Sequence, residues 1–147
     1  MNLFHKVKML RAVCEVSRAR CEMMIIQYSR EEQVLLQSEA SISVQINGLR
    51  QILKTLRTES TVMCSEQLRN ILRKESVLRR KIQDFEMQLL QLKEQHEVLL
   101  KKILEQKNKR GDFLRKEENY KRRLFYQKKV MQRLEMHKDE LEQEDRR

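Results

Sequence analysis

The chain has 147 residues, of which 37% are charged and 39% hydrophobic, and its formal net charge is +10. It contains no proline, no tryptophan and two glycines, whereas globular domains normally use several of each to form turns and fill a core. The composition therefore excludes a rounded domain with a large interior and predicts long helices whose residues mostly face water.

The N-terminal stretch MNLFHKVKMLRAVCEVSRAR contains five basic residues and no apolar run long enough for a signal peptide or a membrane-spanning helix. The three cysteines are odd in number and lack the spacing of a metal site, which is typical of a reducing compartment. Both features predict a cytoplasmic protein.

The first predicted helix covers about residues 2–57. Apolar side chains recur there at alternating spacings of four and three, which is the heptad pattern of a coiled-coil seam. Twelve of the sixteen seam positions are apolar or nearly so: Leu3, Val7, Leu10, Cys14, Ser17, Cys21, Met24, Tyr28, Glu31, Leu35, Ser38, Ile42, Gln45, Leu49, Ile52 and Leu56. Gly48 weakens this helix locally, by about 1 kcal/mol relative to alanine, but is not expected to end it.

A turn is predicted at about residues 58–65. The heptad frame is interrupted across this stretch, TESTVMCS, which has four hydroxyl side chains and no Lys or Arg. Ser65 is suited to cap a following helix, and Glu66 is favourable for the helix dipole just after it.

The second predicted helix covers about residues 66–143, with a possible kink or brief break near Gly111. Its heptad frame runs through Leu68, Ile71, Glu75, Leu78, Ile82, Phe85, Leu89, Leu92, His96, Leu99, Ile103, Gln106, Arg110, Phe113, Glu117, Tyr120, Leu124, Gln127, Met131, Leu134, Lys138 and Leu141. The positions that do not fit a heptad gather towards the C-terminal end of this frame.

The two helices are predicted to form one all-α, antiparallel coiled-coil hairpin over residues 1–147, with the C-terminal helix longer. A lone heptad helix cannot shield its apolar stripe from water, so each arm is expected to pack on the other. With the turn near Thr61, facing residue numbers add to about 123, which places Leu3 opposite Tyr120 and leaves roughly 25 residues extending past the N-terminus. A monomer is expected, since the interrupted frame disfavours a parallel dimer of long helices.

Charge is concentrated at the terminal end of this hairpin. Residues 107–133 contain eleven basic and three acidic side chains, and residues 1–20 contain five and one. Residues 134–147 reverse the balance, with three basic and six acidic side chains. The hairpin brings the two basic segments together, and such an end would be steered towards an acidic partner.

No pattern in the sequence predicts catalysis. There is no glycine-rich phosphate loop, no metal-binding spacing of Cys or His and no nucleophile with a partnered base. His5, His96 and His137 are dispersed, and His96 is read as a polar seam residue. The sequence predicts neither an enzyme nor a cofactor or metal site.

Two segments resemble a known family. ILRKESVLRRKIQDFEMQLLQL (residues 71–92) and FLRKEENYKRR (residues 113–123), in a heptad hairpin with a basic N-terminus, are similar to the SpaM/InvI-type stalk proteins of bacterial type III secretion systems. These proteins are relatives of YscO in other injectisomes and of FliJ in the flagellar export apparatus.

The resemblance implies a non-enzymatic central stalk, similar to the shaft subunit of rotary ATP synthases. One end of such a stalk enters the pore of the hexameric secretion ATPase, and another part reaches the cytosolic domain of the export gate. Family members are also associated with export chaperones. The implied setting is the cytosolic face of the secretion apparatus of a Gram-negative bacterium, in protein export and virulence.

The resemblance also implies contact residues. For the ATPase pore, the matching positions together with the basic end are Lys6, Lys8, Arg11, Leu114, Arg115, Lys116, Glu117, Asn119, Tyr120, Arg122 and Arg123. For the export gate, they are Leu72, Arg73, Lys74, Ser76, Arg79 and Arg80.

Other classes of function remain open at this point: a basic coiled coil that binds nucleic acid, a general scaffold or adaptor, and a helix on a membrane surface. A sequence pI near 9.7 suits phosphate contacts. However, Glu117, Glu118 and the acidic C-terminus interrupt the basic region, and a membrane helix would need the apolar stripe that the hairpin already uses. Stable binding to nucleic acid or membrane is therefore not expected.

Overall fold

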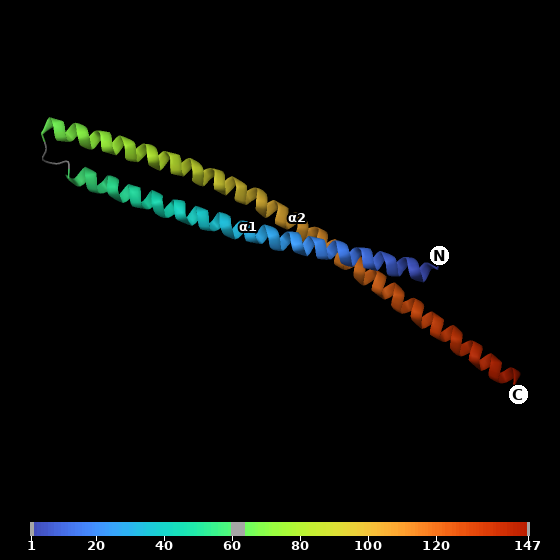
Figure 1. Cartoon of the computed structure of the whole chain (residues 1–147). Helices are drawn as coiled ribbons and strands as arrows, with labels where there is room; N and C mark the ends of the chain where they lie inside the picture. Colours follow the sequence, from blue (N-terminus) through green and yellow to red (C-terminus); the bar gives the residue numbers. More distant parts are fainter. Residues whose placement is uncertain (1, 60–63, 147) are drawn as a thin grey trace. The chain divides into compact units, whose positions relative to one another are not determined.

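The structure, a computed structural model, describes residues 2–59 and 64–146. Helix α1 spans Leu3–Glu59 and helix α2 spans Ser65–Asp145 (Figure 1). The residues that the structure describes contain no strand, and the two helices pack against each other, which confirms the predicted all-α fold. The expected turn falls largely on residues 60–63, which lie outside the described residues.

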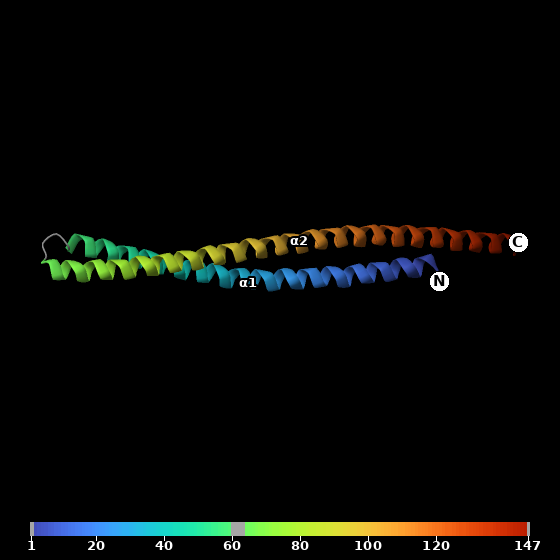
Figure 2. The same ribbon diagram turned by 90° about the horizontal axis from the view of Figure 1, so that it is seen from above.

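The helices divide into two units. The turn unit, residues 27–102, contains the second half of α1 and the first half of α2, and the terminal unit contains residues 1–26 and 103–147. Figure 2 shows α1 and α2 running in opposite directions within each of them.

The seam of α2 follows the predicted frame. From Ile71 to Gln127, the side chains shielded from solvent are those of the predicted heptad positions, with Gly111 in addition. Ile82, Leu99, Ile103 and Leu124 are buried. Helix α2 continues through Gly111 without a break, and no described glycine has a positive φ.

The seam of α1 follows the predicted frame at most of its positions. Val7, Cys14 and Cys21 are buried as expected, but Leu10 is 47% exposed and Ile52 is 51% exposed. At five positions the next residue is shielded in place of the predicted one: Phe4, Arg11, Glu32, Ile46 and Leu53. At three others both the predicted residue and the next are partly shielded: Ser17 and Arg18, Met24 and Ile25, and Ser38 and Glu39. The predicted frame was therefore wrong at five of its sixteen positions, and the five replacements leave the number of apolar residues unchanged.

Ion pairs across the helices give the register. Arg57 pairs with Glu75 and Arg50 with Glu86 in the turn unit, and Arg18 pairs with Glu117 in the terminal unit. Facing residue numbers therefore add to between 132 and 136, and the value near 123 was wrong. The reason is that the first residues of α2 do not pack on α1: residues 64–70 are all exposed, with Leu68 at 41%.

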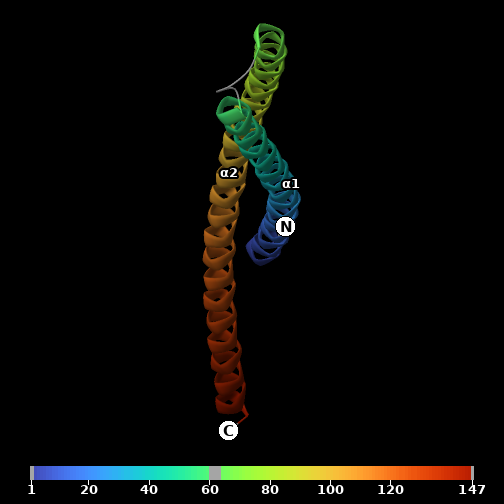
Figure 3. The ribbon, with the colours of Figure 1, turned by 90° about the vertical axis from the view of Figure 1, so that its left-hand side faces the viewer.

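The last part of α2 extends past the start of α1. Every described residue from Lys128 to Arg146 is exposed, including Met131 at 47%, Leu134 at 61% and Leu141 at 50%. Figure 3 shows this end of α2, in red, continuing beyond the N-terminus of α1. The overhang is shorter than predicted because the register is shifted.

Candidate partner-binding site at the basic end

The terminal unit contains a groove between the two helices with an apolar floor and a basic rim, called here the basic groove. It is lined by Phe4, Lys8 and Arg11 of α1 and by Lys121, Leu124, Phe125 and Lys128 of α2. The shifted frame of α1 places Phe4 and Arg11 beside α2, and Leu124 is a buried seam residue. The four cationic side chains are thus presented around apolar surface, an arrangement suited to an acidic amphipathic partner.

Lysine ammonium groups lie over aromatic rings at this end. Lys8 Nζ is 5.2 Å from the Phe4 ring centroid, and Lys129 Nζ is 4.7 Å from that of Phe125. Phe125 also meets Tyr126 edge to face at 6.4 Å, and these two rings are 57% and 67% exposed. Exposed aromatic side chains are enriched where proteins bind each other, and a lysine over a ring adds a cation–π contact.

The structure brings together only part of the predicted pore-contact set. Lys8 and Arg11 line the basic groove, and Lys6 is exposed on the same turns of α1. Arg122 lines an adjoining shallow groove with Lys121, Phe125 and Tyr126. Tyr120 is half-buried in the seam, and Arg123 is exposed.

The remaining predicted residues lie further along α2. Arg115 donates to Asp112 Oδ1 at 2.8 Å, and Lys116 Nζ lies 5.7 Å from the Phe113 ring centroid. Because Glu117 faces Arg18, residues 114–116 lie near that level of α1 and not beside Lys6, Lys8 and Arg11. Leu114, Arg115 and Lys116 do not line the basic groove.

Sequence reasoning did not single out Lys121 and Lys128. They follow the seam residues Tyr120 and Gln127 by one position and therefore flank the seam, where charged side chains of coiled coils meet a neighbouring helix. That spacing could have identified them. The register of the two helices was needed to show that Lys121 and Lys128 lie on the same face as Lys8.

Arg18 of α1 and Glu117 of α2 form an ion pair across the seam of the terminal unit. The guanidinium of Arg18 donates to both carboxylate oxygens of Glu117, at 3.1 and 3.0 Å, and to Glu22 at 3.0 Å. The side chain of Glu117 is only 13% exposed, and that of Arg18 is 30% exposed. The hydrogen bonds to Glu117 and then Glu22 raise the pKa of Arg18. The two polar residues at this level of the seam therefore satisfy each other through charge-assisted hydrogen bonds.

The predicted export-gate residues lie near the start of α2 in the turn unit. All six are exposed: Leu72, Arg73, Lys74, Ser76, Arg79 and Arg80. Arg73 and Lys74 line a groove whose other walls are Ile52, Leu56, Val77 and Leu78. Arg79 is held by Glu75 at 2.7 Å. This second surface also combines cations with apolar side chains.

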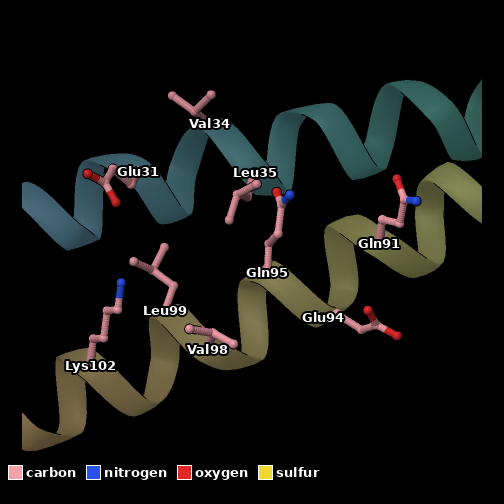
Figure 4. A pocket seen from close by; sticks show the side chains of 9 residues that line it. All are labelled: Glu31, Val34, Leu35, Gln91, Glu94, Gln95, Val98, Leu99 and Lys102. Atoms are coloured by element: carbon pink, nitrogen blue, oxygen red, sulfur yellow. The ribbon is translucent and has the colours of Figure 1, made fainter.

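The centre of the turn unit contains a second polar seam cluster. His96 Nε2 lies 3.2 Å from Glu32 Oε1, and His96 Nδ1 lies 3.8 Å from Glu39 Oε1. The open groove of Figure 4 lies along the same part of α2, from Gln91 to Lys102, and in it Leu35 and Leu99 point towards each other while Val34 points away. The groove combines Glu31, Glu94, Lys102 and glutamines with these apolar groups.

Within the described ranges 2–59 and 64–146, no cluster of His, Cys, Asp and Glu could hold a metal ion. Over the same ranges, neither helix has a stretch apolar and long enough to span a bilayer.

The fold and the grooves define a class of protein: an all-helical protein of two long antiparallel helices with a basic, partly aromatic surface in its terminal unit. The family described as Salmonella surface presentation of antigen gene type M protein matches residues 5–147. The chain belongs to this family, and it is therefore a type III secretion-associated protein. No curated protein and no solved structure matches the chain.

Proposed function

We propose that the protein is the non-enzymatic central stalk of a type III secretion apparatus, at the cytosolic face of the bacterial membrane. Its basic end inserts into the pore of the hexameric secretion ATPase, and its turn unit reaches the cytosolic domain of the export gate. This arrangement supports the export of proteins, with export chaperones as further partners.

The observation that carries the proposal is the basic groove. Lys8 and Arg11 come from one end of the sequence and Lys121 and Lys128 from the other, yet they line one surface. A helix needs charged residues for hydration, but hydration does not require cations from two distant segments to converge over an apolar floor. Such a surface is complementary to an acidic ring lining.

The two-helix cross-section supports a role in coupling. Two helices inside a ring of six subunits contact those subunits unequally, so the stalk can favour one conformation of a subunit over another. The exposed surface around Arg73 and Lys74 supports the second contact, since it lies in the other unit of the chain and is accessible to a different partner.

The test is a fourfold charge reversal of the groove rim: Lys8→Glu, Arg11→Glu, Lys121→Glu and Lys128→Glu. Binding to the secretion ATPase hexamer should weaken at least about tenfold, and any stimulation of ATP hydrolysis by the stalk should be lost, because each reversed charge would face an acidic lining. Binding of the unaltered protein should also weaken with added salt.

The matched control reverses four exposed cations of the turn unit: Lys54→Glu, Arg69→Glu, Lys93→Glu and Lys101→Glu. It changes the net charge by the same amount and should leave ATPase binding nearly unchanged. Equal loss of binding in both variants, or none in either, would overturn the assignment of the groove. A duplex-DNA affinity that falls by several decades between low and physiological salt would favour nucleic-acid binding instead.

A further inference from the structure

The C-terminal overhang of α2 is an amphipathic helix of opposite charge to the basic groove. Residues 134–145, called here the acidic tail, contain six acidic side chains and one basic side chain. The tail continues the α2 heptad with Leu134 and Leu141, which are 61% and 50% exposed. The N-terminal end of α1 does not extend as far as the tail, so the tail has an apolar stripe that no described residue covers.

We propose that the acidic tail of each chain occupies the basic groove of a second copy, forming a symmetric antiparallel dimer. The groove offers an apolar floor with four cations, and the tail offers leucines flanked by carboxylates. Arg11 pairs with Glu15 at 3.3 Å, but among the described residues Lys8, Lys121 and Lys128 have no ion pair, and the tail leucines are exposed. A two-fold axis satisfies both at once, because it pairs each tail with the groove of the other chain.

The heptad spacing gives one register for this dimer. Seam positions of antiparallel coiled coils face each other in layers, and layers whose residue numbers add to 265 bring Met131 opposite Leu134 of the second copy. The same register brings Leu141 of the second copy to the level of Leu124, where α1 already covers the seam, so the tail lies in the basic groove as a third helix beside α1 and α2. The apolar residues of the overhang are then paired around the two-fold axis.

The flanking charges agree with this register. Lys128 and Lys121 lie on one flank of the seam, within two residues of the levels of Glu135 and Glu142 of the second copy. Arg123 lies on the other flank, within two residues of the level of Glu144 of the second copy, so each of these three flanking pairs is of opposite charge. A pattern of this kind selects a partner and an orientation in coiled coils.

The dimer does not depend on the ATPase contact, and it concerns the purified chain alone. It uses the same basic surface, so dimer formation and pore binding would exclude each other. The monomer predicted from the sequence would then be the form released at high salt or by a competing partner.

The test is a charge exchange in the full-length chain, followed by analytical ultracentrifugation at low salt. One variant carries Lys121→Glu and Lys128→Glu, and the other carries Glu135→Lys and Glu142→Lys. Each alone should dimerise at least about tenfold more weakly than the unaltered chain, because every exchanged pair becomes a like-charge pair. An equimolar mixture of the two should regain the dimer, because all four pairs are again opposite in charge.

The control carries Lys93→Glu and Lys101→Glu, two exposed cations of the turn unit, and should dimerise as the unaltered chain does. In about 1 M salt, where the Debye length falls to roughly 3 Å, the unaltered dimer should also weaken. An unaltered chain that stays monomeric at micromolar concentrations and low salt would overturn the proposal. So would a mixture of the two variants that dimerises no better than either alone.

Cross-linking tests the orientation. In a Cys64→Ser background, which removes the exposed cysteine, an equimolar mixture of Met131→Cys and Leu134→Cys chains should oxidise readily to a covalent dimer, because these two seam positions face each other across the two-fold axis. Leu141→Cys alone should not, since the two copies of that position would be about 25 Å apart at 1.5 Å per residue. Efficient cross-linking of Leu141→Cys with itself, and none between positions 131 and 134, would show a parallel dimer and contradict the proposal.

Discussion

Two parts of α2 share one heptad frame but differ completely in burial. From Ile71 to Gln127, the seam positions are shielded by α1, and Ile82, Leu99 and Ile103 are 6–7% exposed. From Lys128 to Arg146, every residue is exposed, although Met131, Leu134 and Leu141 continue the same spacing. A heptad pattern therefore states which side of a helix can be covered, and the partner decides whether it is.

The exposed part also differs in what surrounds its apolar residues. Charged side chains occupy most positions of residues 133–146, whereas the covered seam has apolar residues in nearly every layer. An overhang that remained apolar all round would be an aggregation hazard. The charged flanks permit exposure while leaving a stripe that a partner can cover.

The comparison is tested most strongly by placing the same charge in each part. Leu99→Asp should destabilise the hairpin by about 3–5 kcal/mol, because it loses a buried leucine and buries a carboxylate without a partner. Leu134→Asp should change the monomer's free energy of unfolding by less than about 0.5 kcal/mol, because that side chain is already exposed. Urea unfolding followed by circular dichroism, in salt high enough to keep the chain monomeric, measures both.

Similar destabilisation by the two substitutions would contradict the difference in burial. Retention of the urea-unfolding slope in the Leu134→Asp variant is the accompanying check, since the slope reports the surface exposed on unfolding.

A smaller effect is expected from the charged pair within the covered part. Arg18→Met removes the partner of Glu117, whose side chain is 13% exposed, and should lower the thermal midpoint by less than Leu99→Asp does. The double variant Arg18→Met/Glu117→Leu should regain most of the loss, because no carboxylate is then left unpaired in the seam. A double variant less stable than either single one would show that the residues act independently.

The pH dependence of this pair follows from the sign of its shift. The pKa of Arg18 is raised in the folded chain by its hydrogen bonds to Glu117 and Glu22, so its contribution is present below the unfolded pKa and is lost only as pH rises through the folded value. The difference in midpoint between Arg18→Met and the unaltered protein should therefore be constant from about pH 6 to pH 9. A difference that shrinks with rising pH in this range would contradict the assignment.

Small stabilising effects are expected at the two glycines, Gly48 of α1 and Gly111 of α2. A Cβ at Gly48 would meet no heavy atom within 4 Å, and at Gly111 it would lie 4.0 Å from Arg115 Nη2. Neither has a positive φ, so Gly48→Ala and Gly111→Ala should each stabilise the chain by about 0.5–1 kcal/mol. Destabilisation at Gly111, measured by thermal unfolding, would show that α2 needs flexibility there.

The sequence by itself determined the helical class and the α2 seam. With no proline to interrupt it and apolar residues at regular intervals from Ile71 to Leu124, α2 has one frame that buries most of them, and the structure adopts it. Sequence also indicated that cations from both ends of the chain would lie in one region. These properties follow from local spacing and composition, which need no knowledge of the partner helix.

Only the tertiary structure decided the seam of α1 and the register. The predicted frame of α1 and the adopted one contain equal numbers of apolar residues, so hydrophobic periodicity could not separate them. The adopted frame places Arg18 against Glu117 and puts Glu32 within 3.2 Å of His96, which gives these polar seam residues partners from the other helix. The resulting register brings Lys8 and Arg11 of α1 beside Lys121 and Lys128 of α2, which forms the basic groove. This register depends on pairing between the two helices, and the residue pattern of a single helix does not contain that information.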